Sequence, residues 1–149
     1  MRFHTLAEQL NYPNDFAIKA DGISGTIQNL RQAEGEQPLY GKDTNDHYAV
    51  ITLWPGKADN RRILHLSGNT TWGTLAAAEY ATDAGALRKL QDQFEQCRQR
   101  HGWATHPPYF QVLVHAEVKD NQPIALTYVT HHDLELPGAN TEAVRAALK

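Results

Sequence analysis

An amphipathic stretch flanked by β-rich runs constrains the fold of this chain most. Its apolar side chains recur at a spacing of three, four and three residues: Leu87, Leu90, Phe94 and Cys97. That spacing places all of them on one face of a helix, with charged and amide side chains opposite. Such a helix buries its apolar face against another element, so we expect it to lie on a β-sheet.

The β-rich runs end at turn signals. YAVITLW at 48–54 stops at Pro55-Gly56, and RILHL at 62–66 follows it. YFQVLVHAEVK at 109–119 and IALTYVT at 124–130 are separated by a short polar turn, which predicts a C-terminal β-hairpin. We expect an α/β or α+β fold with a mixed sheet and one long helix layer. The 149 residues predict a single domain over 1–149.

Weaker patterns lie near the two ends of the chain. Residues 5–10 favour a short helix, and 16–20 favour a short strand. An edge strand is expected around Ile23 and Ile27, although glycines interrupt it. Residues 33–47 are polar with Gly and Pro, which is typical of a surface loop, and TEAVRAALK at 141–149 favours a closing helix.

Composition excludes several functional classes. The formal charge is −3, with 14 basic and 17 acidic residues, which argues against a nucleic-acid partner. No run of eighteen apolar residues and no apolar leader is present, so we expect neither a membrane partner nor export. A single cysteine, Cys97, excludes an internal disulfide and favours a reducing, cytoplasmic setting.

The turn between the run 62–66 and the following small-residue helix is the first candidate site. Unpaired amides at a helix start favour an anion, and ligands tend to lie at the carboxyl ends of strands. We therefore predict a bound small molecule, of anionic character, contacted by residues of this turn: Ser67, Gly68, Asn69, Thr70, Thr71, Trp72, Gly73 and Thr74. The alternative is purely structural, with Asn69 or Thr70 capping the helix and Gly73 permitting close packing.

The same stretch carries a resemblance. HYAVITLWPGKADNRRILHL followed by SGNTTWGTLAAAEY resembles the later part of uncharacterised bacterial ligand-sensing domains that are attached to winged-helix DNA-binding domains. Their Gly-Thr-x-x-Ala-x-Glu helix is approximated here by Gly73, Thr74, Ala77, Ala78 and Glu79. The resemblance covers residues 37–136 and implies a sensory or ligand-binding role without an established reaction. A winged helix has no room in this chain, so a regulatory role would require a separate partner protein.

The eight histidines do not form a local metal-binding pattern. His131-His132-Asp133 closes the last β-rich run, and His101 and His106 flank the linker before Tyr109, but no HxH, HxxxH or HExxH spacing occurs. Adjacent histidines in a strand point to opposite faces and do not share one metal easily. The spacing therefore predicts no metal, no cofactor and no effect of chelators on stability.

Two other functions remain open. The amphipathic helix and a sheet edge would also suit a homo-oligomer or a protein-interaction module without a ligand. A small enzyme would use Glu79 or a histidine near the turn, because a carboxylate among apolar neighbours is a candidate acid or base. No catalytic motif is present, so catalytic residues are not assigned, and Cys97 on the apolar stripe is predicted to be a core residue.

Overall fold

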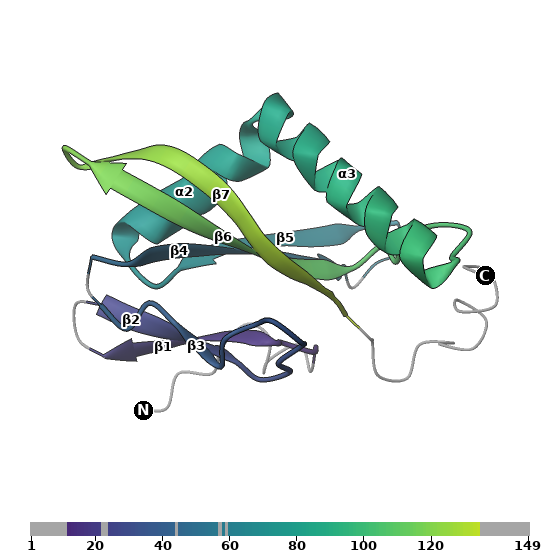
Figure 1. Ribbon diagram of the computed structural model, residues 1–149, viewed down its shortest axis with the longest axis horizontal. Coiled ribbons are helices and arrows are strands. Elements are labelled where there is room, and N and C mark those ends of the chain that lie inside the picture. Colours follow the sequence, from purple (N-terminus) through teal and green to yellow (C-terminus); the bar gives the residue numbers. More distant parts are fainter. Residues whose placement is uncertain (1–11, 22–23, 44, 57, 59, 135–149) are drawn as a thin grey trace.

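A computed structural model describes residues 12–21, 24–43, 45–56, 58 and 60–134, and these residues form two antiparallel sheets and two helices (Figure 1). The small sheet has the strand order β1-β2-β3, and the large sheet has the order β5-β4-β6-β7. Their bounds are β1 Phe16–Asp21, β2 Ser24–Asn29, β3 Leu39–Tyr40, β4 His47–Pro55, β5 Arg62–Gly68, β6 Phe110–Lys119 and β7 Gln122–Asp133. The helices are α2 Thr71–Thr82 and α3 Ala84–His101.

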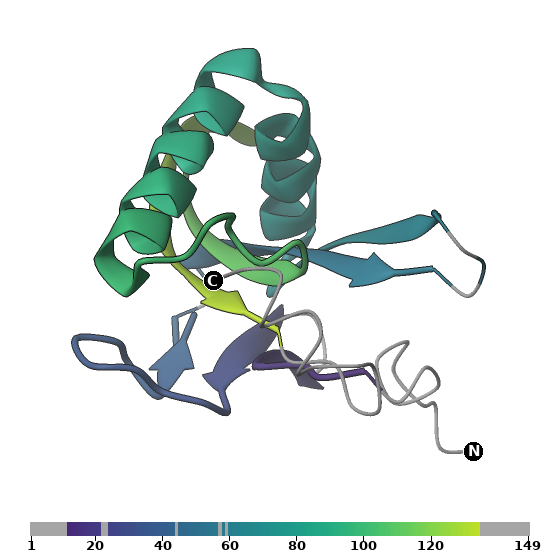
Figure 2. The same ribbon diagram turned by 90° about the vertical axis from the view of Figure 1, so that its right-hand side faces the viewer.

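The large sheet forms the middle layer. Figures 1 and 2 show α2 and α3 on one of its faces and the small sheet on the other. Successive side chains of a strand point to opposite faces, so β4 contributes Ile51 to the core under the helices and Val50 to the core between the sheets. This explains why β4 and β6 are apolar at consecutive positions instead of alternating.

Capping residues set the helix bounds. Thr70 caps α2, and the side chain of Asp83 caps α3 by accepting from the Gly85 amide at 2.8 Å. Gly102 ends α3 in the left-handed conformation with φ 67°, which a glycine adopts without strain. Asp83 and Gly102 thus mark the two ends of α3.

The predicted apolar face of α3 is confirmed in three of its four positions. Leu90 and Cys97 are buried, and Phe94 is half-buried against the core. The prediction was wrong for Leu87, whose exposed fraction is 38%. Leu87 lies in the first turn of α3, just after the junction with α2, and its side chain faces solvent there.

The α+β alternative is confirmed, and the C-terminal hairpin is formed by β6 and β7. Every described strand pair is antiparallel, whereas the sequence predicted a mixed sheet. The reason is that β4 lies between β5 and β6 and runs against both, so the crossover through the helices creates no parallel neighbour. The predicted helices at 5–10 and 141–149 lie outside the described residues.

The strand predicted at 16–20 is present as β1, and Ile27 lies in β2. Within the predicted loop 33–47, Leu39 and Tyr40 form the two-residue strand β3. In the described part of the chain, neither helix is long and apolar enough to cross a membrane.

Candidate metal centre

Four metal-ligating side chains from three separate elements converge at one end of the large sheet. Cys97 lies near the C-terminal end of α3, His106 lies in the loop that follows, and His131 and Asp133 lie at the end of β7. One ligand atom of each lies within 4.8 Å of all the others. We call these residues, Cys97, His106, His131 and Asp133, the metal centre.

Local structure explains how each side chain reaches this point. The apolar face of α3 turns Cys97 toward the sheet, and residues two apart on a strand share a face, which places His131 with Asp133. After α3, the Gly102 turn reverses the chain, and the amide of Trp103 donates to the carbonyl of Arg98 at 3.0 Å. His106 then returns over the helix end.

An aromatic ring supports both imidazoles. Phe94 stacks on His106 with ring centroids 4.3 Å apart and an interplanar angle of 10°. The same ring meets His131 edge-on, with centroids 4.8 Å apart. Phe94 therefore holds both rings in place and keeps water from one side of the metal centre.

Hydrogen bonds orient the two imidazoles. Nδ1 of His106 lies 2.8 Å from the carbonyl oxygen of Pro107. A carbonyl only accepts, so Nδ1 carries the proton, and the neutral ring then keeps a lone pair on Nε2. Nδ1 of His131 lies 2.7 Å from the hydroxyl of Tyr128, which leaves its Nε2 to face the metal centre. A histidine that ligates a metal almost always has its other nitrogen held in this way.

The distances suit a tetrahedral metal ion. Zinc bonds of about 2.0–2.3 Å in tetrahedral geometry place ligand atoms roughly 3.3–3.7 Å apart. In the metal centre, Oδ1 of Asp133 lies 3.0 Å from Nε2 of His106 and 3.8 Å from Nε2 of His131. Sγ of Cys97 lies 4.0 Å from Oδ2 of Asp133. Shifts of about an ångström or less would bring the ligand atoms of all four residues to bonding distance from one zinc ion.

Two buried atoms of the metal centre make no hydrogen bond in the described part of the chain. Nε2 of His106 and Oδ1 of Asp133 are buried, and neither makes a hydrogen bond to any described residue. They lie only 3.0 Å apart, yet their geometry does not allow a hydrogen bond between them. Buried polar atoms without partners are rare and costly. A cation between them would satisfy both.

Burial also sets the charge states of two ligands. It lowers the pKa of His131 to about 4, and the nearby Asp133 carboxylate does not offset this, so the imidazole is neutral at pH 7. Burial and then Asp133 raise the pKa of the Cys97 thiol. A neutral imidazole is the form that binds a metal, whereas the thiol loses its proton when a cation binds.

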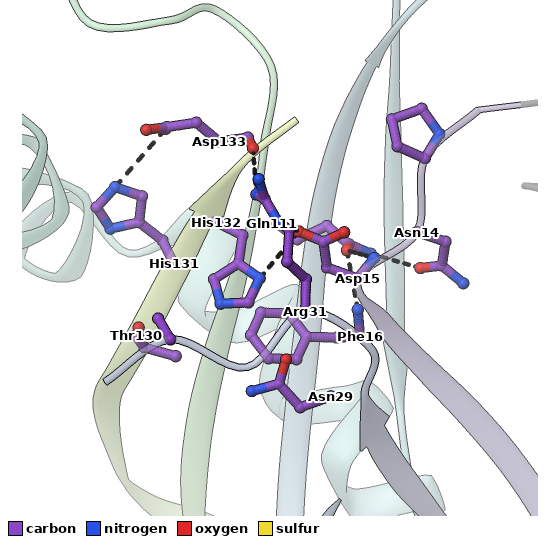
Figure 3. Close-up of polar contacts among 12 residues, drawn as sticks. Asn14, Asp15, Phe16, Asn29, Arg31, Gln111, Thr130, His131, His132 and Asp133 are labelled. Atoms are coloured by element: carbon purple, nitrogen blue, oxygen red, sulfur yellow. Dashed lines mark hydrogen bonds and ion pairs between the residues drawn. The ribbon is translucent and has the colours of Figure 1, made fainter. Parts of the chain in front are cut away.

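His132 points to the opposite face of β7 and joins the two sheets (Figure 3). Its Nδ1 lies 2.9 Å from Oδ2 of Asp15, and its Nε2 lies 2.7 Å from Oε1 of Glu36. Burial alone would lower the pKa of His132, but the hydrogen bonds to these carboxylates outweigh it and raise the pKa. We call Asp15, Glu36 and His132 the inter-sheet clamp.

Glu36 makes the protein sensitive to acid. Burial would raise its pKa, but hydrogen bonds from Thr130, the Ala33 amide, Asn29 and His132 lower it from 4.5 to about 2. Because the folded-state pKa lies below the unfolded value, this stabilisation is complete above pH 4.5 and is lost as the pH falls toward 2. A shift of this size is equivalent to about 3 kcal/mol.

Urea unfolding between pH 2 and pH 6 measures this effect, and Glu36→Gln should flatten the pH dependence. Glu95→Gln is the matched control. The pKa of Glu95 is also lowered to about 2, first by Arg98, but its side chain is 51% exposed and its ion pair is screened by water. An equal pH dependence in wild type and Glu36→Gln would contradict this assignment.

The turn predicted to bind a ligand is held by hydrogen bonds to the start of β4. Asn69 is buried, its Oδ1 accepts from the Tyr48 amide at 2.8 Å, and its Nδ2 donates to the Asp46 carbonyl at 2.7 Å. Thr70 Oγ1 accepts from the Gly73 amide at 3.1 Å and lies 2.7 Å from Nδ1 of His47. Both polar side chains thus serve capping and packing.

The glycines of the turn allow close approach of backbones. A Cβ on Gly68 would lie 2.3 Å from the carbonyl carbon of Gly73. The hydroxyls of the turn do not point to one common position. Ser67 donates to the Val50 carbonyl at 3.5 Å, and Thr74 donates to the Thr70 carbonyl at 3.3 Å. Thr71 is exposed and Trp72 is half-buried. Ligand binding at Ser67–Thr74 stays a prediction.

Sequence reasoning missed the metal centre because it searched for ligands on one element. It correctly separated His131 from His132, but it did not use the pair His131 and Asp133, which the alternation of a strand places on one face. Cys97 on the sheet-facing stripe was the second usable signal. Glu79, the predicted alternative acid or base, is exposed on α2, away from the metal centre.

Comparisons with protein-family models, with curated proteins and with solved structures find no match to this chain. The function is therefore argued from the chemistry of the metal centre itself.

Proposed function

We propose that this protein is a metal-binding domain that holds one zinc ion at Cys97, His106, His131 and Asp133. The observation that carries the proposal is the convergence of their ligand atoms within 4.8 Å, two of which are buried without a hydrogen bond to a described residue. Nε2 of His106 and Oδ1 of Asp133 form an ion pair at 3.0 Å only when the imidazole is protonated. A cation bound to the neutral imidazole and the carboxylate satisfies both atoms without that proton.

The chemistry of the donor set favours zinc. One sulfur, two imidazole nitrogens and one carboxylate oxygen match the ligands that zinc takes in proteins. Calcium and magnesium prefer oxygen ligands alone, and a thiolate favours a softer ion. Cobalt(II) accepts the same ligands and serves as a coloured probe.

The number of ligands favours a structural or sensing role for this ion. Catalytic zinc sites keep one position open for water, whereas structural sites fill four positions with protein atoms. Here four residues converge, and their side chains are mostly shielded: His131 is 7% exposed, His106 12% and Asp133 23%. The ion would tie the end of α3 to the end of β7.

Titration of metal-free protein with zinc, against a chromophoric chelator, tests the proposal. We expect one zinc per chain, and cobalt(II) should give the absorption of a tetrahedral thiolate site. Zinc at a hundredfold excess over its dissociation constant should stabilise the fold by about 2.7 kcal/mol. Removal of the ion by a chelator should reverse this gain, in contrast to the expectation from sequence spacing.

Variants connect binding to the four residues. Cys97→Ser and His106→Gln should each weaken zinc binding strongly, because each removes one ligand. His115→Gln is the control, since His115 is a partly exposed histidine on β6 that pairs with Asp46 and lies outside the metal centre. Zinc that binds Cys97→Ser as tightly as the wild type would overturn the proposal.

A further inference from the structure

The residues of β7 that bind the small sheet alternate with those of the metal centre. His131 and Asp133 face α3, whereas His132 between them reaches Asp15 and Glu36 on the other side (Figure 3). Thr130 Oγ1 donates to Oε2 of Glu36 at 2.6 Å. The last four residues of β7 thus serve two sites, one on each face of the sheet.

Asp133 itself takes part on both faces. Its carboxylate belongs to the metal centre, and its backbone carbonyl accepts a hydrogen bond from Nη2 of Arg31 at 2.7 Å. Nε of Arg31 donates to Oδ2 of Asp15 at 2.9 Å. A shift of Asp133 therefore reaches Arg31 directly and Asp15 through Arg31.

The inter-sheet clamp depends on alignment. The side chain of His132 is 5% exposed, that of Glu36 is 7% exposed and that of Asp15 is 13% exposed. A buried polar network stabilises only when its members are all satisfied, and a small misalignment leaves charges without partners. The position of the end of β7 therefore decides how much the inter-sheet clamp contributes.

We propose that zinc at the metal centre controls the docking of the small sheet on the large one. This inference rests on the proposed function. The bound ion fixes the end of β7, which aligns His132 and the Asp133 carbonyl with their partners. These partners lie just before β1 (Asp15), just after β2 (Arg31) and between β2 and β3 (Glu36). Loss of the ion frees the end of β7 and promotes local opening between the sheets. The presence or absence of zinc thereby determines how much of the small sheet is exposed.

Hydrogen exchange followed by mass spectrometry tests this coupling. We compare peptides of β1 and β2 with peptides of β4, in metal-free and zinc-loaded protein. If the protein binds zinc equally well whether the small sheet is docked or open, zinc does not change the hydrogen-exchange rates of β1 and β2. If docking and binding are coupled, zinc slows that exchange, and we expect about tenfold, a typical coupling between two sites.

Uncoupling variants separate this effect from general stabilisation. Arg31→Met removes the hydrogen bond to the Asp133 carbonyl at a half-exposed residue, and Glu36→Gln weakens the inter-sheet clamp without touching a ligand. Each should still bind zinc and should lose most of the zinc-dependent protection of β1 and β2. Cys97→Ser should lose both binding and protection.

The outcomes distinguish the two proposals. Zinc binding without a change in the exchange of β1 and β2 would overturn the coupling and leave the proposed function intact. Full zinc-dependent protection in both uncoupling variants would also overturn it. A wild-type protein that fails to bind zinc would remove the proposed function, and the coupling with it.

Discussion

Gly73→Ala should lower the free energy of unfolding by about 3 kcal/mol, at the upper end of the range for overpacking a dense interior. Gly73 lies in the first turn of α2, where the helix crosses the start of β4. A Cβ at this position would lie 2.3 Å from the carbonyl oxygen of Tyr48. The obstacle is backbone, which cannot rotate away, so α2 or β4 has to move.

The same contact fixes several neighbouring groups, which increases the expected cost. The Tyr48 carbonyl accepts from the Asn69 amide at 3.3 Å, and the Tyr48 amide donates to the Asn69 side chain. Displacing β4 from α2 therefore strains the cap of the helix together with the packing. Denaturant unfolding without any added ligand measures the loss.

Gly85→Ala is the matched control for this substitution. Gly85 lies in the first turn of α3, where the nearest atom to an added Cβ is a side-chain oxygen of Asp83 at 3.3 Å. We expect its effect on stability to stay within about 1 kcal/mol, the difference in helix propensity between glycine and alanine. Equal stabilities of the two variants would contradict the packing role of Gly73.

Local signals predicted much of the fold. The three-four-three spacing identified α3, and the short polar turn after Lys119 marked the hairpin. These features depend on residues close in sequence, where capping and periodicity act directly. Leu87 shows the limit of periodicity, because the face of a helix does not reveal how far along its length the helix meets the sheet.

The pairing of the strands could not be predicted from short segments of the sequence. The short strands of the small sheet carry little pattern of their own, and tertiary contacts hold them. Gln111 on β6 accepts from the amides of Asp15 and Phe16 at 2.7 Å and 3.1 Å through its side-chain oxygen. Such a bond joins residues about a hundred positions apart, so no window of sequence contains both partners.

The metal centre was partly within reach of the sequence. Strand alternation pairs His131 with Asp133, and the helical stripe directs Cys97 at the sheet. His106 was out of reach, because its position follows from the path of an irregular loop after Gly102. A search for ligands that share a face, instead of ligands at fixed motif spacing, would have found three of the four residues.

Tyr128→Phe should weaken zinc binding about 10–100-fold, the usual cost of removing a group that orients a ligating histidine. A metal on Nε2 of His131 requires the proton on Nδ1, and the hydroxyl oxygen of Tyr128 lies 2.7 Å away to accept it. Burial raises the pKa of Tyr128, so the phenol stays neutral.

Tyr80→Phe provides the control for Tyr128→Phe, because the two substitutions remove the same atom from two tyrosines of one core cluster. The hydroxyl of Tyr80 is buried and bonds to no described residue, so its removal should leave zinc affinity unchanged. Competition titrations of both variants and of the wild type give the comparison. Because Tyr80 belongs to the core cluster on which the partly buried Tyr128 packs, a general loosening of that core would weaken zinc binding in both variants. A selective loss in Tyr128→Phe therefore assigns the effect to the orientation of His131, and equal affinities in the two variants would exclude it.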